Sequence, residues 1–379
     1  MLEREAYMWL GHLTTLRQSD IDKLFRLFGS ADEIYKNLYE DRDVLRRLTE
    51  KKLLKEETEL EIVNEDVIAW DKSLRKSMKE TSINCVTPVD DKYPKRLLKL
   101  SDRPLSLYYR GDISLAEREH IIAIIGSRKV SQYGMLTTEE FAKELSFRGI
   151  TVVSGMAYGV DGKAHRAALK AGGGTIAVLG GGVDICYPRT NIDIYLEMCE
   201  SQLVLSEYMP KTAHISLHFP ARNRIISGLS DGVLVIEASL RSGTLITVDR
   251  ALEQGRTIYA IPGRTTDIMS KGTNNLIKQG ANLVDSPSDI IKDMLGIDIN
   301  RRKKATRADV MDELREPLTE KEKTILGYLG FEPVFLDDLI RNNNMNISET
   351  LTILRSLERR DLITTVDHSF YMLKKQNCC

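Results

Sequence analysis

The segment FPARNR, residues 219–224, places an aromatic side chain beside two cations. Phe219 can offer a flat face to a base, and an arginine fork can bind a phosphate. Because residues two apart on a helix point in different directions, we expect either Arg222 or Arg224 to face a ligand and the other to brace a loop or a carboxylate. With Asn223 between them, these residues indicate contact with single-stranded nucleic acid. The alternative is a helix whose cations are simply solvated.

Four short loops that contain glycine follow apolar runs of the chain. Glycine lets a backbone approach a phosphate closely, and serine or threonine adds a hydroxyl donor. Four such loops at one edge favour a phosphate-binding surface over four unrelated tight turns. In the first loop Arg128 stands where a Rossmann loop usually has a small residue, so we expect its guanidinium to bind phosphate. The loops are Gly126-Ser127-Arg128, SGMAYGVDGKAH at 154–165, Gly180-Gly181-Gly182 and Ser242-Gly243-Thr244.

No loop carries a recognisable cofactor motif. The chain has neither G-x-G-x-x-G nor G-x-x-x-x-G-K-[ST], so neither NAD nor any other cofactor is expected. His165 follows Asp161 by four residues and is expected to cap a helix or satisfy the core, while Glu237 has no partner carboxylate at a helical or strand spacing. Six histidines and five scattered cysteines form no ligand pattern, so we predict no metal site and no catalytic residue.

The composition is that of a soluble globular protein, since 42% of the 379 residues are hydrophobic and 29% are charged, and no apolar run is long enough for a membrane span. This length predicts two or three domains. The first residues carry acids where a signal peptide carries basic residues, which predicts a cytoplasmic location. Because the net charge is -1, a nucleic acid would have to be bound by a local basic cleft and not by the field of the whole molecule.

Strands and helices that alternate between residues 120 and 295 must position these loops. Runs such as HIIAII, ITVVS and GVLVIEA are apolar throughout, as parallel strands covered on both faces are, and amphipathic stretches separate them. They predict a Rossmann-like, doubly wound, mainly parallel α/β sheet within a core domain over residues 87–297. Ahead of it we predict a helical domain over residues 1–80 and, at 87–112, a strand-poor connector punctuated by proline.

The end of the chain predicts a third domain. A basic linker covers residues 298–317, which include RRKKATR. Residues 318–375 then show three helical stretches, each opened by a threonine, a serine or an acidic residue suited to capping, and a hairpin follows with its turn at residues 367–369. Three helices and a hairpin predict a winged helix.

Seven motifs occur in order between about residues 90 and 290: GSR at 126–128, SGMAYGVDGKAH at 154–165, GGGVDICYP at 180–188, SEY at 206–208, FPARNRIISGLS at 219–230, EASLRSGTLIT at 237–247 and AIPGR at 260–264. Together they resemble the motifs of the DprA (Smf) family, the DNA-processing proteins of bacterial transformation. The resemblance implies a Rossmann-like core that binds single-stranded DNA, forms homodimers and helps to load the recombinase RecA onto incoming strands. It also implies a SAM-like N-terminal helical domain and a C-terminal winged helix.

The resemblance also implies particular DNA contacts, at Arg128 with Ser127 beside it and at Phe219. The chain departs from the family pattern at one place, because some members have a lysine three positions before that phenylalanine and this chain has a serine there. Lys163 and Lys170 are candidates to supply the missing positive charge. As surface lysines on a helix, they could also be simply solvated.

Two other functions remain open. Nucleotide-cleaving Rossmann-like enzymes of the lysine-decarboxylase-like group are similar at the SGT helix start, where they carry P-G-G-x-G-T followed by a glutamate. Here Leu240 and Arg241 replace the proline and the first glycine, and no glutamate stands in the adjoining turn. The winged helix could instead read duplex DNA through its third helix. From Leu318 to Cys379 eight lysines and arginines stand against nine acids, so a protein-contact or regulatory role is an equal alternative.

Overall fold

The computed structural model describes residues 2–64, 66–297, 318–330, 333–343, 345–360, 362–366 and 369–373 of the chain. These residues fall into two compact units, Met1–Ile299 and Asn300–Cys379. The predicted basic linker at 298–317 lies outside the described residues, as do residues 367 and 368 of the predicted hairpin turn. No described helix has the length and apolar character needed to cross a membrane.

The N-terminal part of the first unit is helical, because apolar side chains recur on one face of each helix. In α2 the predicted face is confirmed: Leu24 is buried, and Ile21 and Phe25 pack beside it in the same core as Trp9. The elements are α1 (Glu3–His12), α2 (Gln18–Phe28), α3 (Ala31–Tyr35), the π-helical turn η1 (Lys36–Glu40), α4 (Arg42–Glu50), α5 (Glu56–Asn64) and α6 (Val67–Glu80).

A nine-stranded sheet follows, with the order β1-β2-β6-β5-β4-β3-β7-β8-β9. Every neighbouring pair from β6 to β9 is parallel, which confirms the predicted doubly wound, mainly parallel α/β fold. The strands are β1 (Asn84–Val86), β2 (Leu107–Gly111), β3 (Ile121–Ile125), β4 (Thr151–Ser154), β5 (Thr175–Val178), β6 (Leu203–Ser206), β7 (Gly232–Val235), β8 (Thr257–Ala260) and β9 (Asn282–Leu283).

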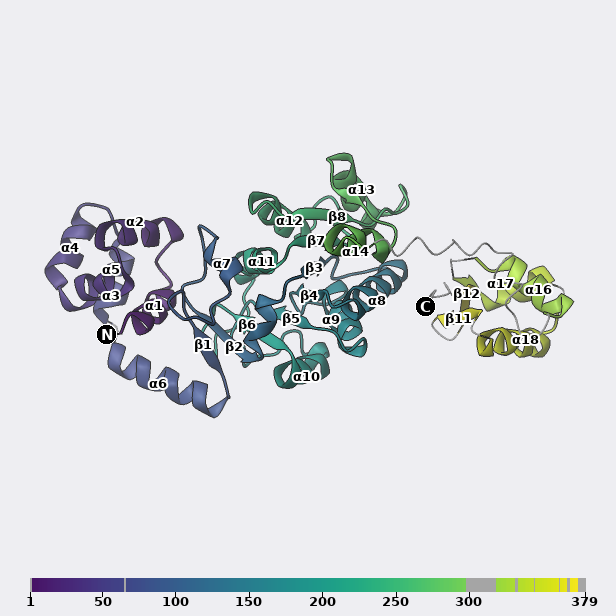
Figure 1. Cartoon of the computed structure of the whole chain (residues 1–379), viewed down its shortest axis with the longest axis horizontal. Helices are drawn as coiled ribbons and strands as arrows, with labels where there is room; N and C mark the ends of the chain where they lie inside the picture. The colour runs from purple at the N-terminus through teal and green to yellow at the C-terminus, as the bar shows by residue number, and fades with distance from the viewer. Residues whose placement is uncertain are drawn as a thin grey trace. The chain divides into compact units, whose positions relative to one another are not determined.

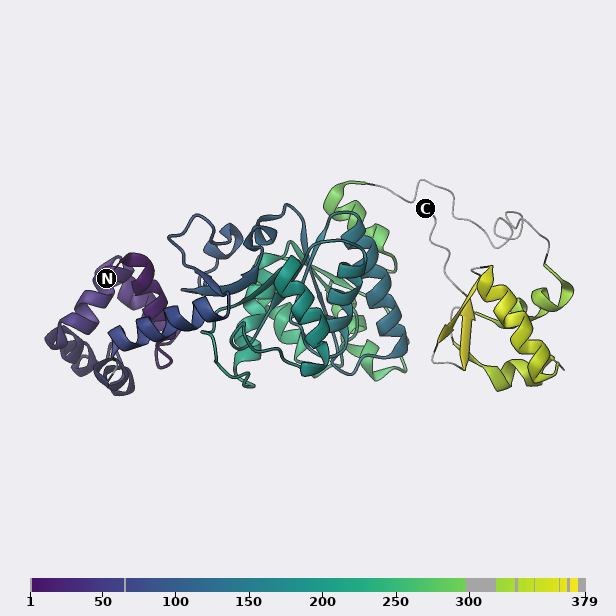
Figure 2. The ribbon, with the colours of Figure 1, turned by 90° about the horizontal axis from the view of Figure 1, so that it is seen from below.

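Helices cover both faces of the sheet, so successive residues of a central strand enter different cores. In β3, Ile122 and Ile124 pack into one core, while Ile121 and Ile125 pack into the other. Figure 1 shows the two helix layers on opposite sides of the sheet, and Figure 2 shows α8 and α9 side by side. Burial on both sides explains why the strand sequences are apolar throughout. One layer contains α8 (Gln132–Phe147), α9 (Val160–Lys170), α10 (Ile192–Ser201) and α14 (Pro287–Leu295), and the other contains α11 (His218–Leu229), α12 (Thr244–Glu253) and α13 (Lys271–Lys278).

The proline-rich segment before β3 differs from the prediction of a strand-poor connector. It contains β2, which pairs antiparallel with β6, and β2 in turn pairs with β1, so the sheet begins at Asn84 and not at the predicted strand near residue 120. Its prolines end short pieces without preventing a strand, because Leu107 and Tyr108 are fully buried in the cores on either side. The short helix α7 (Lys95–Leu98) also packs there, through Leu97.

The C-terminal unit has three helices and a three-stranded antiparallel sheet of order β10-β12-β11 within its described residues. Thr319 and Glu322 form the capping box that opens α16, as the sequence suggests. The third helix begins one residue after Asn346, which caps it in place of the predicted serine. The second predicted helix is shorter, because Val334 and Phe335 form a strand. The elements are α16 (Glu320–Tyr328), β10 (Val334–Phe335), α17 (Leu336–Asn343), α18 (Ile347–Arg359), β11 (Ile363–Val366) and β12 (Phe370–Leu373).

Candidate nucleic-acid interface

The sheet changes its direction of winding between β3 and β7. From β3 the chain moves outward through β4, β5 and β6, and it then returns to place β7 on the other side of β3. Ligands of open α/β sheets bind beyond the carboxyl ends of the strands at such a switch point. Because β3 ends at Ile125, the loop Gly126-Ser127-Arg128 leaves the sheet at this point.

The loops after β3 and β4 touch each other through their backbones. The backbone N–H of Ser127 donates to the carbonyl of Glu237 at 2.9 Å, which ties the first loop to the end of β7. Gly159 has φ +75°, and a Cβ there would lie 2.4 Å from the Ser127 carbonyl oxygen, so this position admits no side chain. The predicted convergence of glycine loops therefore occurs here, and it fixes the backbone that carries Arg128.

Arg128 is exposed and available for a ligand. Its guanidinium carbon lies 5.0 Å from the centre of the Phe219 ring. Within the part of the chain that the structure describes, no carboxylate pairs with it, and the same holds for its exposed neighbour Lys129. Two cations without counter-charges among the described residues, placed at a switch point, form a site at which an anion can bind.

Phe219 joins the loops after β5 and β6. It lies in the first turn of α11 and is partly buried. Its ring contacts Tyr187, at 5.9 Å between centroids, and His214, at 6.4 Å. A Cβ on Gly180 would come within 3.1 Å of the ring, so the backbone after β5 approaches it closely. The aromatic residue of the opening motif thus sits among the glycine loops, as the sequence suggests.

Arg222 points into the protein. It is 3% exposed, and its Nη1 donates to the carbonyl oxygen of Gly155 at 2.7 Å and to that of Val178. Burial lowers the pKa of Arg222 to about 10, an effect that nearby Asp161 opposes and Arg128 reinforces. Burial also raises the pKa of Asp161, although the Arg222 charge and hydrogen bonds from the N–H groups of Gly155 and Ala157 act against this.

Arg224 is also bound internally. Its two Nη groups donate to the Glu207 carboxylate at 2.7 and 2.6 Å, and its Nε donates to the carbonyl of Asp102 at 2.8 Å. The prediction that one arginine faces a ligand is therefore wrong for the structure described. The reason is helix phase: Arg222 is three and four residues before Ile225 and Ile226, which bury the inward face of α11. Asn223, between the arginines, is partly exposed.

His165 and Glu237 serve the scaffold. His165 is fully buried, its Nδ1 lies 2.8 Å from the Thr175 hydroxyl, and burial lowers its pKa to about 3. The prediction of a core role for this histidine is confirmed. Glu237 is 3% exposed and accepts hydrogen bonds from the backbone N–H of Ser131, at 2.9 Å, and from its hydroxyl at the start of α8. Neither side chain faces the rim as a free acid or base.

The two lysines offered for the missing charge are placed differently from the prediction. Lys163, in the first turn of α9, pairs with Glu139 at 2.5 Å. Lys170 ends α9, and the next strand, β5, begins five residues later, so Lys170 lies at the opposite edge of the sheet from the glycine loops. A helix of this length spans about 16 Å, so Lys170 is too far from Arg128 to act beside it.

Ser242, Gly243 and Thr244 open α12 after β7, at the same edge as Arg128. The Ser242 hydroxyl donates to the Thr244 hydroxyl at 2.9 Å and accepts from the Thr244 N–H at 3.2 Å. A Cβ on Gly243 would meet nothing within 4 Å. These residues form a self-bonded helix start that is open to solvent, unlike the tight contact between the loops after β3 and β4.

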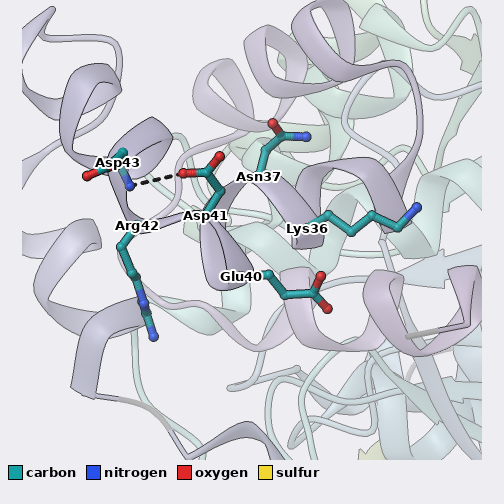
Figure 3. A pocket seen from close by; sticks show the side chains of 6 residues that line it. All are labelled: Lys36, Asn37, Glu40, Asp41, Arg42 and Asp43. Atoms are coloured by element: carbon teal, nitrogen blue, oxygen red, sulfur yellow. Dashed lines mark hydrogen bonds between the residues drawn. The ribbon is translucent and has the colours of Figure 1, made fainter.

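A separate hollow lies in the N-terminal helices, at η1 and the start of α4, and Figure 3 shows its lining residues. Two of its charged side chains already have partners: Lys36 pairs with Glu33 at 2.6 Å, and the Asp41 carboxylate accepts from the N–H of Asp43 at 3.1 Å. This hollow is far in sequence from the switch point, and Asp41, which lines it, caps α4. In the described ranges, no three His, Cys, Asp or Glu side chains gather as metal ligands would.

Comparison with known proteins assigns both units. Residues 84–295 match the model of the DNA recombination-mediator protein A family, and residues 311–367 match the DprA winged helix domain. DNA processing protein DprA from Streptococcus pneumoniae is 45% identical over 203 residues, which are 54% of this chain and 71% of that protein. The chain belongs to the DprA/Smf family.

Two solved structures of the family resemble this one. The X-ray structure of DprA from Streptococcus pneumoniae has a TM-score of 0.65 and 34% identity, and it covers 77% of this chain and 97% of that chain. The structure of DNA processing protein A from Helicobacter pylori, which concerns that protein's single-stranded DNA binding mode, has a TM-score of 0.52 and 32% identity over 56% of this chain and 96% of that chain. Family membership also makes the C-terminal unit a DprA winged helix.

Two residues at the rim were missed by sequence reasoning. Lys129 stands next to Arg128 in the same exposed loop, and its charge was a sufficient signal. Tyr187 belongs to the third glycine loop and is 41% exposed in contact with Phe219. It was not predicted because the sequence of that loop was considered only for its three glycines.

Proposed function

We propose that this chain binds single-stranded DNA at the carboxyl edge of its sheet. The observation that carries the proposal is Arg128, an exposed arginine with no carboxylate partner among the described residues, which lies at the switch point and over the Phe219 ring. The relative from Helicobacter pylori, whose structure concerns single-stranded DNA binding, supports the same ligand.

The geometry suits the binding of single-stranded DNA of any sequence and not the recognition of particular bases. Arg128 and Lys129 supply charge for phosphates, and aromatic side chains beside them can stack on any base. Arg222 donates to the carbonyls of Gly155 and Val178 and so ties together the segments behind this surface, an internal role that reads no base. Binding of this kind depends little on sequence.

We propose further that the DNA is an incoming strand in natural transformation, which the chain protects and on which it helps to load RecA, working as a homodimer through its core. The names of the family and its relatives, DNA recombination-mediator protein and DNA processing protein, support this role. Sedimentation of the full chain at micromolar concentration tests the dimer. RecA filament assembly on strands coated by a single-strand binding protein, with and without this chain, tests the loading.

The same proposal makes the rim a binding surface and not an active site. Its support is that Ser131 binds the buried Glu237 carboxylate and that His165 is fully buried, with its Nδ1 bound to Thr175. The rival enzyme would release a base from nucleoside monophosphates. Incubation of the purified chain with such nucleotides, followed by chromatography for free base, decides between the two functions.

The direct test of the main proposal is a gel shift with single-stranded and double-stranded oligonucleotides of equal length over a range of salt. We expect preferential binding of the single strand, with log affinity falling against log salt at about -0.7 per phosphate neutralised. Equal affinity for duplex, or an affinity that salt does not change, contradicts the proposal.

A further inference from the structure

Three rings contact one another beside Arg128. Tyr187 and His214 stack with centroids 5.3 Å apart and planes 22° apart, and each of them also contacts Phe219. Tyr187 comes from the loop after β5, while the other two come from the segment that leads from β6 into α11. The cluster therefore joins two of the glycine loops into one aromatic surface at the rim.

Several groups already contact the ring of Phe219. The Arg128 guanidinium lies 5.0 Å from its ring centre and that of Arg222 lies 5.9 Å from it. The backbone of Gly180 approaches so closely that a Cβ there would be 3.1 Å from the ring. Phe219 is only partly exposed, so it offers a base less open surface than Tyr187 does.

Tyr187 is the outer ring of the cluster. It is 41% exposed, and its ring contacts among the described residues are those with His214 and Phe219. His214 covers one of its faces, so the exposure belongs to the remainder of the ring. An aromatic face that is supported from behind and open in front is the form that base stacking uses.

His214 gives Tyr187 a fixed and uncharged support. Its Nε2 lies 3.0 Å from the carbonyl oxygen of Ile185, and because a carbonyl only accepts, Nε2 carries the proton and donates. Its buried Nδ1 has no hydrogen-bond partner in the described structure. Burial, together with the Arg222 charge, lowers the pKa of His214, which keeps the ring neutral.

We infer that Tyr187 stacks on a nucleobase of the bound single strand, with Phe219 and His214 as positioning residues behind it. The inference rests on the proposed function, because it assumes that a strand's phosphates occupy Arg128. The neighbouring cations of Arg128 and Lys129 favour a polyanion that also carries aromatic groups. The phenol hydroxyl takes no part in stacking.

The test measures affinity for a thymidine 20-mer and for an abasic phosphodiester chain of the same length. We expect Tyr187→Ala to weaken binding of the thymidine strand by about 5- to 150-fold, the range for one stacked base, and Tyr187→Phe to bind like the native chain. The abasic chain should bind native protein and Tyr187→Ala equally, with the same salt slope. Phe147→Ala is the matched control, because Phe147 is 69% exposed at the end of α8 away from the rim.

A tryptophan variant makes the test independent of any loss of folding. In Tyr187→Trp the new indole should be quenched by the thymidine strand and not by the abasic chain, while Phe147→Trp should be quenched by neither. The two native tryptophans, Trp9 and Trp70, lie in the N-terminal helices and give the background signal.

Several results would overturn the inference while the proposed function stands: an unchanged affinity in Tyr187→Ala, an equal loss on both probes, an equal loss in Tyr187→Phe, or an unquenched Tyr187→Trp. Each requires that the native chain still prefers the single strand and that Arg128→Ala still weakens it. Failure of the native chain to bind the thymidine strand overturns the proposed function and the inference together.

Discussion

The loop after β3 and the start of α11 bring arginines to the same aromatic ring, and they use them in opposite ways. Arg128 is exposed and has no carboxylate partner within the described structure. Arg222 lies 5.9 Å from the same ring, yet it is 3% exposed and donates to two carbonyls inside the protein. One guanidinium is available to a ligand, and the other holds the loops that present it.

This difference shows that a cluster of charges in a sequence does not separate contact from support. A buried arginine satisfies several backbone carbonyls at once, since it has five donors in a rigid fork. At a surface built from glycine loops, which have few side chains of their own, such support is needed. Affinity and stability should therefore respond to different arginines, and the following experiments test that division.

The largest effect should come from Arg222→Ala. Removing a buried charge leaves Asp161 buried without its favourable neighbour and removes the Arg222 donor from the carbonyls of Gly155 and Val178, so we expect a loss of about 3–5 kcal/mol in the free energy of unfolding. Urea unfolding measures it. Arg250→Ala is the control, because Arg250 forms an exposed pair with Glu253 and should change stability by under about 1 kcal/mol. Equal losses of stability in the two variants would show that the buried Arg222 stabilises the fold no more than the exposed Arg250 does.

A second effect should appear in the pH dependence of stability. The folded pKa of His165, about 3, lies below its ordinary value of 6.5, so its stabilising contribution is present above pH 6.5 and is lost as the pH falls toward 3. Comparison with His165→Asn isolates this group: the stability advantage of the native chain should shrink by about 2 kcal/mol between pH 7 and pH 5. Urea unfolding at several pH values measures the difference. A constant difference over that interval would mean that His165 becomes charged inside the fold.

Arg128→Ala should act on affinity and spare stability. Loss of one charge-assisted contact predicts about a tenfold to hundredfold weaker binding of single-stranded DNA and a salt slope smaller by about 0.7. Salt titrations measure both quantities, and a thermal melt should match that of the native chain. If Arg128→Ala instead melts early and keeps its salt slope, the loop arginine is structural like Arg222.

The smallest effect should come from Lys170→Ala. Because Lys170 lies at the other edge of the sheet, its removal should change neither affinity nor salt slope beyond about twofold. The same titrations measure it. A reduced slope would show that the strand continues around to the far edge and that the rim is not the whole interface.

Much of the fold could be predicted because burial leaves a strong pattern. The runs that form β3 to β8 are mostly apolar, and helices with one apolar face separate them. The order of strands and helices predicted that the loops at the carboxyl ends of the strands meet at one edge. The position of Arg128 in the first of these loops predicted that it lies at that edge. The antiparallel strands β1 and β2 were missed, because prolines nearby dominate a short segment whose pairing is with distant β6.

The direction of Arg222 could not be predicted from the arginine spacing alone. The signal was present in the next turn, since Ile225 and Ile226 mark the inward face of α11 and Arg222 lies one turn before them. The partners Gly155 and Val178 lie just after β4 and at the end of β5, 67 and 44 residues before Arg222, so their carbonyls could be assigned only from the structure. The prediction that Lys170 supplies charge at the rim was wrong for a different reason. Lys170 ends a helix that begins at the rim, and the length of that helix places Lys170 at the opposite edge of the sheet.

The glycines of the rim differ in the space around them, and this difference determines which of them can be replaced during evolution. A Cβ at Gly155 would lie 2.6 Å from the Arg222 guanidinium and one at Gly159 would lie 2.4 Å from a carbonyl oxygen, whereas one at Gly243 would meet nothing within 4 Å. Replacement by alanine is sterically free at the third site and blocked at the first two. Natural variation should accumulate at Gly243 while the other two positions stay unchanged, so the loop before α12 is where the shape of the rim can change without rebuilding the loops beside it.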